Sequence, residues 1–300
     1  MARRSVRSSK RPSSSAEPPT LPVGPVPIDT GTAEVVPDLD HSGRVTLQVN
    51  GVPSSYLDLD DPGFLAFEYM QQMDAVVAAT TDGPLRALHL GAAGCALARR
   101  WDVERPGSRQ LAIDVDARLV TLVRAWFDLP RAPRLRLRAD DAAAAVATAP
   151  PASYDVVVRD VFAGDATPEH LVTRQVAERV AAALRPGGLY LVNCADRPPL
   201  DRARRELATL AAAFGPDAVA SGRLALVAEP GILKGRRYGN LVLAAVRPLP
   251  EDAADTDDAD NAAPDLGAPA LARALRALPV PAQVLTADEL ARFVGTARPY

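Results

Sequence analysis

The fold is decided by residues 85–116, which read LRALHLGAAGCALARRWDVERPGSRQLAIDVD. An apolar run ends at Gly91, the small-residue loop Gly91–Gly94 opens a segment of helical character, and a second apolar run ends at Asp114. A strand, a glycine turn, a helix and a second strand ending in an acid are typical of a nucleoside-binding βαβ unit. The glycines let a ligand lie against the backbone at the helix N-terminus, and the acid accepts hydrogen bonds from ribose hydroxyls.

The same alternation of strands and helices continues on the C-terminal side of this unit. We expect strands at residues 85–90, 109–114, 134–138, 154–160 and 187–193, and helices at about 94–103, 117–128, 140–148, 168–185 and 200–213. Two further extended runs, 224–228 and 240–246, are expected to form an antiparallel pair that closes the sheet. The sequence therefore predicts an α/β fold with a doubly wound, mostly parallel, Rossmann-like sheet of seven strands.

The chain divides into five predicted parts. Residues 1–40 are rich in Pro, Ser and charge and are expected to be a disordered tail. Residues 41–82 are predicted to form a small β-hairpin region, turning at Asn50-Gly51, and a helix that starts at Asp61-Pro62. Residues 83–248 are the Rossmann-like nucleoside-binding catalytic domain, 249–265 an acidic linker, and 266–300 a C-terminal helical segment that docks on the main domain or partners another chain.

Composition excludes several classes of protein. The net charge of −3 gives no reason to expect nucleic-acid binding, and no apolar run is long enough to span a membrane. The N-terminus lacks the apolar core of a secretory signal, so we expect a cytoplasmic protein. Cys95 and Cys194 indicate neither a disulfide framework nor a zinc site, and we expect no metal. His89 lies inside the first predicted strand and is expected to pack in the core.

Acidic residues follow three consecutive predicted strands. They are Asp114 and Asp116, then Asp140 and Asp141, then Asp160. Ligands of open parallel sheets bind beyond these strand ends, and a cationic ligand would explain why like charges are gathered there. Helix N-capping is the alternative explanation for Asp116, Asp140 and Asp141. The spacing from Gly91 to Asp114 suits nicotinamide and adenosyl-sulfonium ligands equally, whereas the acid after the third strand favours the sulfonium class.

The region from Arg44 to Val246 resembles the spermidine synthase (polyamine aminopropyltransferase) family, which has the class I S-adenosylmethionine-dependent methyltransferase fold. The segment Tyr154–Asp160 is similar to the family's Y-D-x-I-I-x-D strand, and Leu184–Gly188 matches its L-x-P-G-G. Asn50-Gly51 followed by a Tyr-bearing helix resembles its N-terminal β region. The loop from Asp160 to Thr173 is similar to one in divergent bacterial spermidine-synthase-like proteins.

The resemblance implies roles for individual residues. Gly91 and Gly94 would line the nucleoside, Asp114 would bind the ribose, and Asp140, with Asp141 beside it, would contact the adenine. Asp160 would be the catalytic Asp beside the attacking amine, and the acceptor would be bound by Asp165, Glu68 and Tyr69. Decarboxylated S-adenosylmethionine or S-adenosylmethionine would be the donor substrate, and a small-molecule amine the acceptor. Relatives of this family often form dimers, so a homodimer is the assembly to test, although no residue in the sequence indicates it.

The sequence also departs from the family pattern. Ala163 occupies the position of a second Asp that holds the diamine, and Gly94 that of an acid contacting the donor's amino group. Ser54 replaces a Gln, and Phe67-Glu68-Tyr69 replaces Tyr-His-Glu. An aminopropyltransferase is the first hypothesis. The alternatives are a methyltransferase that uses intact S-adenosylmethionine and a non-catalytic nucleoside-binding protein.

Overall fold

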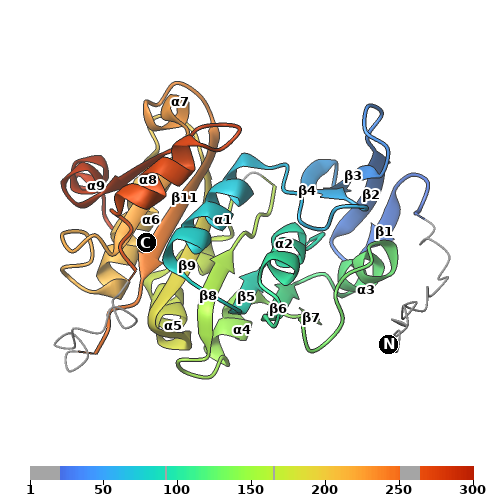
Figure 1. Ribbon diagram of the computed structural model, residues 1–300, viewed down its shortest axis with the longest axis horizontal. Helices are drawn as coiled ribbons and strands as arrows, with labels where there is room; N and C mark the ends of the chain where they lie inside the picture. Colours follow the sequence, from blue (N-terminus) through green and yellow to red (C-terminus); the bar gives the residue numbers. More distant parts are fainter. Residues whose placement is uncertain (1–20, 92, 165, 251–263) are drawn as a thin grey trace, which may run out of the picture.

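Two β-sheets organise the molecule. The computed structural model describes residues 21–91, 93–164, 166–250 and 264–300. An eight-stranded sheet runs through its centre, and a four-stranded antiparallel sheet lies at one end (Figure 1). No helix within these ranges is long and apolar enough to cross a membrane.

The central sheet has the order β12-β10-β11-β9-β8-β5-β6-β7. Strands β5 to β9 are parallel, whereas β10, β11 and β12 pair antiparallel. Their bounds are β5 Arg86–Leu90, β6 Arg109–Asp114, β7 Leu135–Ala139, β8 Tyr154–Arg159, β9 Leu184–Asp196, β10 Leu224–Ala228, β11 Gly239–Val246 and β12 Gln283–Thr286. The predicted doubly wound α/β fold and the antiparallel closing pair are confirmed.

The expected number of strands was wrong by one. The extra strand, β12, is four residues long and pairs with β10. A run this short, placed directly before a helix, has no periodicity of its own that would distinguish it from a loop.

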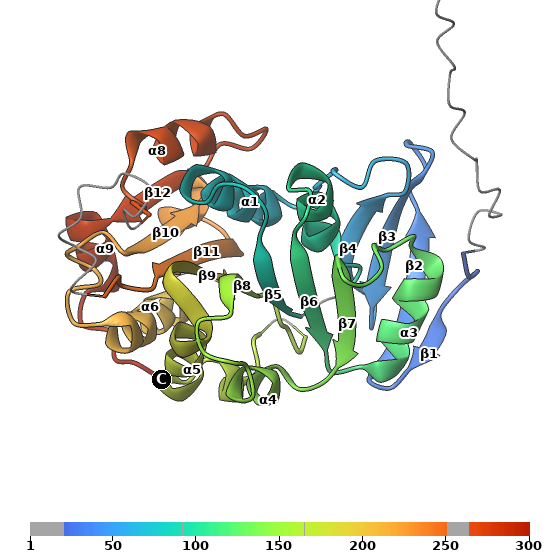
Figure 2. The ribbon, with the colours of Figure 1, turned by 60° about the horizontal axis from the view of Figure 1, so that its bottom comes forward.

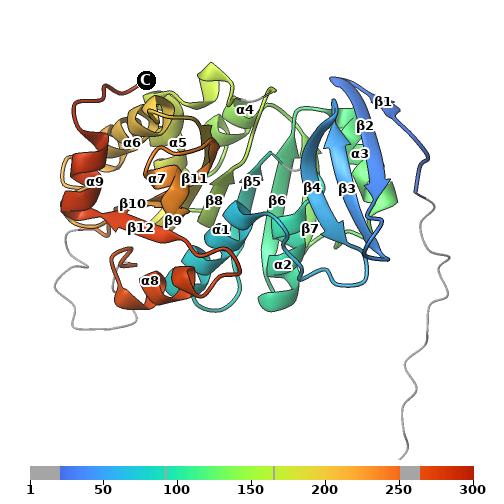
Figure 3. The ribbon, with the colours of Figure 1, turned by 90° about the horizontal axis from the view of Figure 1, so that it is seen from above.

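Helices cover both faces of the central sheet (Figures 2 and 3). Buried side chains of one core cluster come from α1 (Glu68–Thr80), α2 (Ala96–Glu104), α3 (Ala117–Trp126) and α8 (Pro269–Arg276). Those of the other come from α4 (Ala142–Ala147), α5 (Arg174–Ala183), α6 (Asp201–Phe214) and α9 (Ala287–Val294). A short 3-10 helix, η1 (Glu169–Leu171), and the single turn α7 (Pro230–Leu233) complete the set.

Two helices begin later than expected. The first starts at Glu68, because Asp61 accepts a hydrogen bond from the Gly63 amide and closes a turn there instead of capping a helix. The helix expected from residue 168 starts at Arg174, where Thr173 provides the cap. Pro168 and the three residues after it form the turn and 3-10 helix that lead into the helix.

The N-terminal sheet corrects the expectation for residues 1–40. Its strands are β1 (Val26–Ile28), β2 (Gly31–Pro37), β3 (Arg44–Val49) and β4 (Val52–Asp58), so the predicted hairpin is half of a larger sheet. Ala33 and Val35 are buried on the inner face of β2. Local composition was misleading because β2 gains its stability from pairing with β3 and from this apolar face. Residues 1–20, and 251–263 of the expected acidic linker, lie outside the described ranges.

The C-terminal segment packs on the main domain. In addition to β12, it places α8 against α1 and α9 against α6. The Tyr300 amide donates to Thr209 Oγ1 at 2.9 Å.

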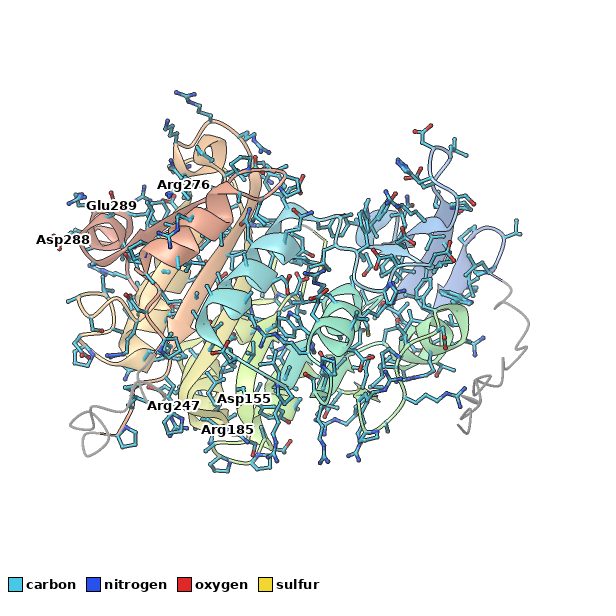
Figure 4. All side chains as sticks on the ribbon, viewed as in Figure 1. Asp155, Arg185, Arg247, Arg276, Asp288 and Glu289 are labelled. Atoms are coloured by element: carbon cyan, nitrogen blue, oxygen red, sulfur yellow. The ribbon has the colours of Figure 1, made fainter. Side chains whose placement is uncertain are left out.

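At the amino ends of the strands, an ion pair of 2.7 Å between Asp155 and Arg185 joins β8 to the start of β9 (Figure 4).

Candidate functional site

A cavity of about 760 Å³ lies at the carboxyl ends of the central parallel strands. It brings together Gly91 after β5, Asp114 at the end of β6, Asp140 and Asp141 after β7, and Asp160 after β8. Glu68 and Tyr69 of α1 also line it. Seven of the nine site residues expected from the sequence therefore share one cavity. Of the other two, Asp165 lies outside the described residues and Gly94 is discussed below.

Gly91 occupies a position that other residues fit poorly. Its φ of +87° is in the region that favours glycine, and a Cβ built there would lie 2.0 Å from the backbone oxygen of Asp160. The turn after β5 therefore passes directly beside the start of the loop after β8. Close approach of these two backbones brings Asp160 next to the predicted nucleoside loop.

Gly94 has a packing role in this structure and is not one of the residues lining the cavity. A Cβ at this position would lie 2.9 Å from Ser55 Cβ and 3.1 Å from Leu57 Cδ1. Its amide donates to Ser55 Oγ at 2.9 Å. The glycine thus lets α2 approach β4 of the N-terminal sheet, which differs from the expected contact with a nucleoside.

The Asp114 carboxylate is hydrogen-bonded to the glycine loop. It accepts hydrogen bonds from the amides of Ala93 at 3.2 Å and Asp116 at 3.0 Å. These contacts fix the carboxylate at the end of β6, in the wall of the cavity. Asp114 therefore lies beside the glycine turn, and its ribose-binding role stays a prediction.

Asp116 has a structural role as well as a place in the cavity wall. It caps α3 by accepting from the Leu119 amide at 2.7 Å. The other carboxylate oxygen accepts from the amide and hydroxyl of Thr30, at 2.7 and 2.8 Å. Burial raises the pKa of Asp116, but these hydrogen bonds outweigh it and the pKa lies below its ordinary value. The capping alternative for this residue is therefore confirmed.

Asp140 and Asp141 form the end of the cavity beyond β7. Asp140 makes an ion pair of 3.0 Å with Arg138. Asp141 caps α4, and its second carboxylate oxygen lies 3.0 Å from His170 Nε2 of η1. This contact joins the loop after β8 to the loop after β7. Both carboxylates line the cavity, so capping and ligand contact are compatible at Asp141.

Asp160 is held by hydrogen bonds from two neighbouring elements. Tyr69 of α1 donates its hydroxyl to Oδ2 at 2.8 Å, and Asn193 of β9 donates its amide to Oδ1 at 2.9 Å. Burial raises the pKa of Asp160 above its ordinary value, although these two hydrogen bonds lower it in part. Burial and the Asp160 charge raise the pKa of Tyr69 well above its usual value, so its hydroxyl stays protonated and donates.

The charged side chains of the cavity wall are predominantly acidic. Six carboxylate side chains line the described part of the cavity, and no lysine or arginine lines it. They are Glu68, Asp114, Asp116, Asp140, Asp141 and Asp160. Phe162 and Tyr238 also line the cavity and add aromatic surface. This composition suits a ligand that carries positive charge and an apolar or aromatic body.

Three residues of the site escaped the sequence analysis. Thr30 comes from the segment expected to be disordered. Ser55 lies on β4, where its hydroxyl accepts a hydrogen bond from the Gly94 amide. Asn193 supports Asp160 from β9. Its signal was present in the sequence, because it is a polar residue in the apolar run from Leu189 to Ala195.

His89 is a core residue, as expected. It is buried in β5, and its Nε2 lies 2.9 Å from Gln110 Oε1. Burial lowers its pKa to about 4. Within the described ranges, no group of three or more His, Cys, Asp and Glu side chains is arranged to hold a metal ion.

The sequence and the structure of the chain were compared with those of known proteins. No family model matches the chain. Over 153 residues it is 28% identical to a polyamine aminopropyltransferase of Chromobacterium violaceum, an alignment covering 51% of this chain and 56% of the relative. A polyamine aminopropyltransferase of Neisseria meningitidis is 26% identical over 154 residues, with the same coverage. The chain thus spans about half the length of the curated relatives it matches.

Solved structures extend the likeness to nearly the whole chain. A probable spermidine synthase from Corynebacterium glutamicum is 35% identical with a TM-score of 0.79, covering 94% of this chain and 96% of that one. A human methyltransferase-like protein 13 in complex with SAH is 20% identical with a TM-score of 0.51, covering 78% and 96%, and shows the fold alone. The chain therefore belongs to the spermidine synthase-like family and has a class I methyltransferase-like fold.

Proposed function

We propose that this protein transfers an aminopropyl group from decarboxylated S-adenosylmethionine to a primary amine, with methylthioadenosine as the second product. The observation that carries the proposal is the cavity wall with six carboxylates and neither lysine nor arginine among its described residues. Both substrates are cations, and carboxylates in a partly desolvated site attract them. Nucleotides with phosphate groups would instead need cationic or helix N-terminal partners.

The nucleoside would lie across the ends of β5, β6 and β7. Gly91 lets it approach the backbone, Asp114 accepts hydrogen bonds from the ribose, and Asp140 with Asp141 faces the adenine. The sulfonium would then lie between this end of the cavity and Asp160. Tyr69, which donates to Asp160, and the adjacent Glu68 also line the cavity, and they would contact the acceptor.

Asp160 would orient the attacking amine and receive its proton. An alkylammonium must lose one proton before it can attack, since its ordinary pKa is about 10. Its nitrogen then forms a bond to the propyl carbon beside the sulfonium, the carbon–sulfur bond breaks, and the electron pair stays on sulfur. The products are a secondary ammonium, neutral methylthioadenosine and one proton, which leaves through the Asp160 carboxylate. The raised pKa of Asp160 makes its carboxylate a better proton acceptor.

Intact S-adenosylmethionine fits the same nucleoside position less well. Its additional carboxylate would enter a wall that has no described lysine or arginine to pair with it. Like charges in such a site repel, so we expect the decarboxylated donor to bind at least tenfold more tightly, or about 1.4 kcal/mol. The methyltransferase hypothesis predicts the opposite preference.

The test is release of methylthioadenosine from decarboxylated donor and 1,4-diaminobutane (putrescine). Asp160→Asn should lower kcat by roughly 10²–10⁴-fold, because the variant retains the shape of the side chain but cannot accept the proton. Asp155→Asn is the matched control, with the same substitution at the opposite end of β8, and should leave kcat within about threefold. No product with any amine, in a protein that binds methylthioadenosine, would contradict the proposal and support a non-catalytic nucleoside-binding role.

A further inference from the structure

Positive charge is concentrated in one segment of the chain, outside the acidic cavity. Residues 118–138, which extend from α3 to β7, contain six arginines and a single acidic residue, Asp128. The arginines are Arg118, Arg124, Arg131, Arg134, Arg136 and Arg138. The chain as a whole has a net charge of −3, so this segment differs strongly from its surroundings. β7 is also the last strand of its sheet, which leaves the segment on an outer edge.

Three of these arginines surround a surface depression. Its described lining consists of Arg124, Arg131 and Arg136 with the apolar residues Ala132, Leu135 and Leu137. No aspartate or glutamate belongs to this described lining. By contrast, Arg134 and Arg138, which lie outside the depression, each form an ion pair with an aspartate. The depression therefore holds cationic side chains whose charge the described part of the protein does not pair.

Arg124 is fixed by the backbone around it. Its Nη1 donates to the Pro130 carbonyl oxygen at 2.8 Å, and its Nη2 donates to the Leu135 carbonyl oxygen at 3.3 Å. Both acceptors are uncharged, so these hydrogen bonds hold the guanidinium group while leaving its charge unpaired. A cation that is already held in place loses less conformational entropy when an anion binds.

Protection of the sheet edge explains only part of this arrangement. Charged side chains on an edge strand discourage pairing with other chains, and Arg136 of β7 is such a residue. Arg124 belongs to α3, and Arg131 to the loop that follows it, so neither is on the edge strand. The convergence of three arginines from three elements on one depression instead favours a ligand with negative charge.

We propose that this depression binds a linear phosphate chain, such as that of a nucleoside triphosphate. Guanidinium groups offer paired N–H donors that match the oxygens of phosphate groups. Several phosphate groups in a row would serve arginines that come from different elements, and Ala132, Leu135 and Leu137 would contact an organic part of the ligand. None of the lining residues belongs to the acidic cavity, so this inference goes beyond the proposed function and does not depend on it.

Isothermal titration calorimetry with tripolyphosphate measures binding directly. Titrations of the wild type and of the double variant Arg131→Gln with Arg136→Gln are run at the same ionic strength, because salt screens exposed charges. We expect the affinity to fall about tenfold or more in the double variant, since each glutamine removes a charge and a paired donor. Both side chains are exposed, so the variant should melt within about 2 °C of the wild type.

The matched control is Arg86→Gln with Arg109→Gln. These two arginines are also exposed and lie opposite each other at the amino ends of β5 and β6, outside the depression. The control removes the same amount of charge, so its affinity for tripolyphosphate should stay within about twofold of the wild type. An equal loss in both double variants would show only general attraction to surface arginines and would overturn the proposal, as would the absence of binding to the wild type.

Two further ligands identify the source of the phosphate chain. ATP that binds at least as tightly as tripolyphosphate, and loses affinity only in Arg131→Gln with Arg136→Gln, would support a nucleotide ligand. ATP that binds more weakly than tripolyphosphate would support an inorganic phosphate chain. A short single-stranded RNA that binds more tightly than either would indicate a nucleic-acid surface and overturn the proposal.

Discussion

Replacing Glu206 by leucine is expected to lower the free energy of unfolding by about 3–5 kcal/mol, because it leaves a buried charge on Arg159 without its partner. Arg159 Nη2 lies 2.5 Å from Glu206 Oε2, and the two side chains are only 2% and 7% exposed. Arg159 also donates from Nη1 to the Leu171 backbone oxygen at 3.3 Å. The ion pair therefore links β8 to α6. Through Leu171 it also holds η1, whose His170 lines the cavity.

The same reasoning predicts a different result for the double variant. Replacing both partners by apolar residues, as in Arg159→Met with Glu206→Leu, removes the two desolvated charges together. Such replacements are often neutral or stabilising by about 1–4 kcal/mol. We expect the double variant to lie within about 2 kcal/mol of the wild type, far closer than Glu206→Leu alone. The coupling between the two positions should therefore be large and of opposite sign to the single losses.

Urea denaturation of the wild type, both single variants and the double variant measures these differences, provided that the slope of free energy against urea is unchanged. A loss below about 1 kcal/mol in Glu206→Leu would contradict a desolvated ion pair. A double variant as unstable as Glu206→Leu would show that the cost arises from packing, and not from the charge left on Arg159.

Three further predictions concern the cavity and its surroundings. Gly91→Ala should abolish the rise in melting temperature with methylthioadenosine, since its Cβ would lie 2.0 Å from the Asp160 backbone oxygen. Thr30→Val should destabilise the protein by about 1.5–3 kcal/mol in denaturant melts, because it removes the hydroxyl bonded to the Asp116 carboxylate. His89 stays neutral in the folded protein down to pH about 4, whereas the unfolded chain takes up a proton below pH 6.5. Its contribution to stability is therefore lost as pH falls from 6.5 to 4, by at most about 3 kcal/mol, and His89→Gln should flatten this part of the pH dependence.

Each of these changes has a matched control in the chain. Gly231→Ala should be tolerated, because a Cβ built at this position would lie 3.6 Å from Arg237 Nε, an ordinary van der Waals distance. Thr121→Val removes a hydroxyl that bonds only to its own helix and should change stability by less than about 0.5 kcal/mol. His41→Gln replaces an exposed histidine and should change the free energy of unfolding by less than about 0.5 kcal/mol. Controls as damaging as the variants would refute the corresponding explanations.

The proposed nucleoside end of the cavity was predictable because its parts are local in the sequence. Each parallel strand carries its own terminal residues, and the carboxyl ends of neighbouring parallel strands share one edge. Gly91, Asp114, Asp140 and Asp160 could therefore be placed together without knowledge of packing between distant segments. Gly94 shows the limit of this reasoning, since a glycine that permits ligand approach and one that permits close packing leave the same sequence pattern. Its neighbour Ser55 is 39 residues away.

Thr30 depends on a contact over a longer separation. It is 86 residues from Asp116, and the contact exists only because β1 and β2 add to the N-terminal hairpin. The apolar positions of β2 that hold this sheet in place are Ala33 and Val35, separated by a charged residue. Two buried side chains in a stretch rich in Pro, Thr and Gly are too few to reveal a strand by periodicity.

The proposed acceptor end depends on the antiparallel register of β9 and β11, which the sequence left open. Strand β11 pairs with β9 so that Val242 lies opposite Asn193 and Asn240 lies opposite Ala195. Asn193, Ala195 and Asn240 consequently line the cavity together. A register shift of one residue would turn these side chains to the other face of the sheet. The proposed acceptor end therefore depends on how the last strands add to the parallel sheet, whereas the proposed nucleoside end depends on the strand ends themselves.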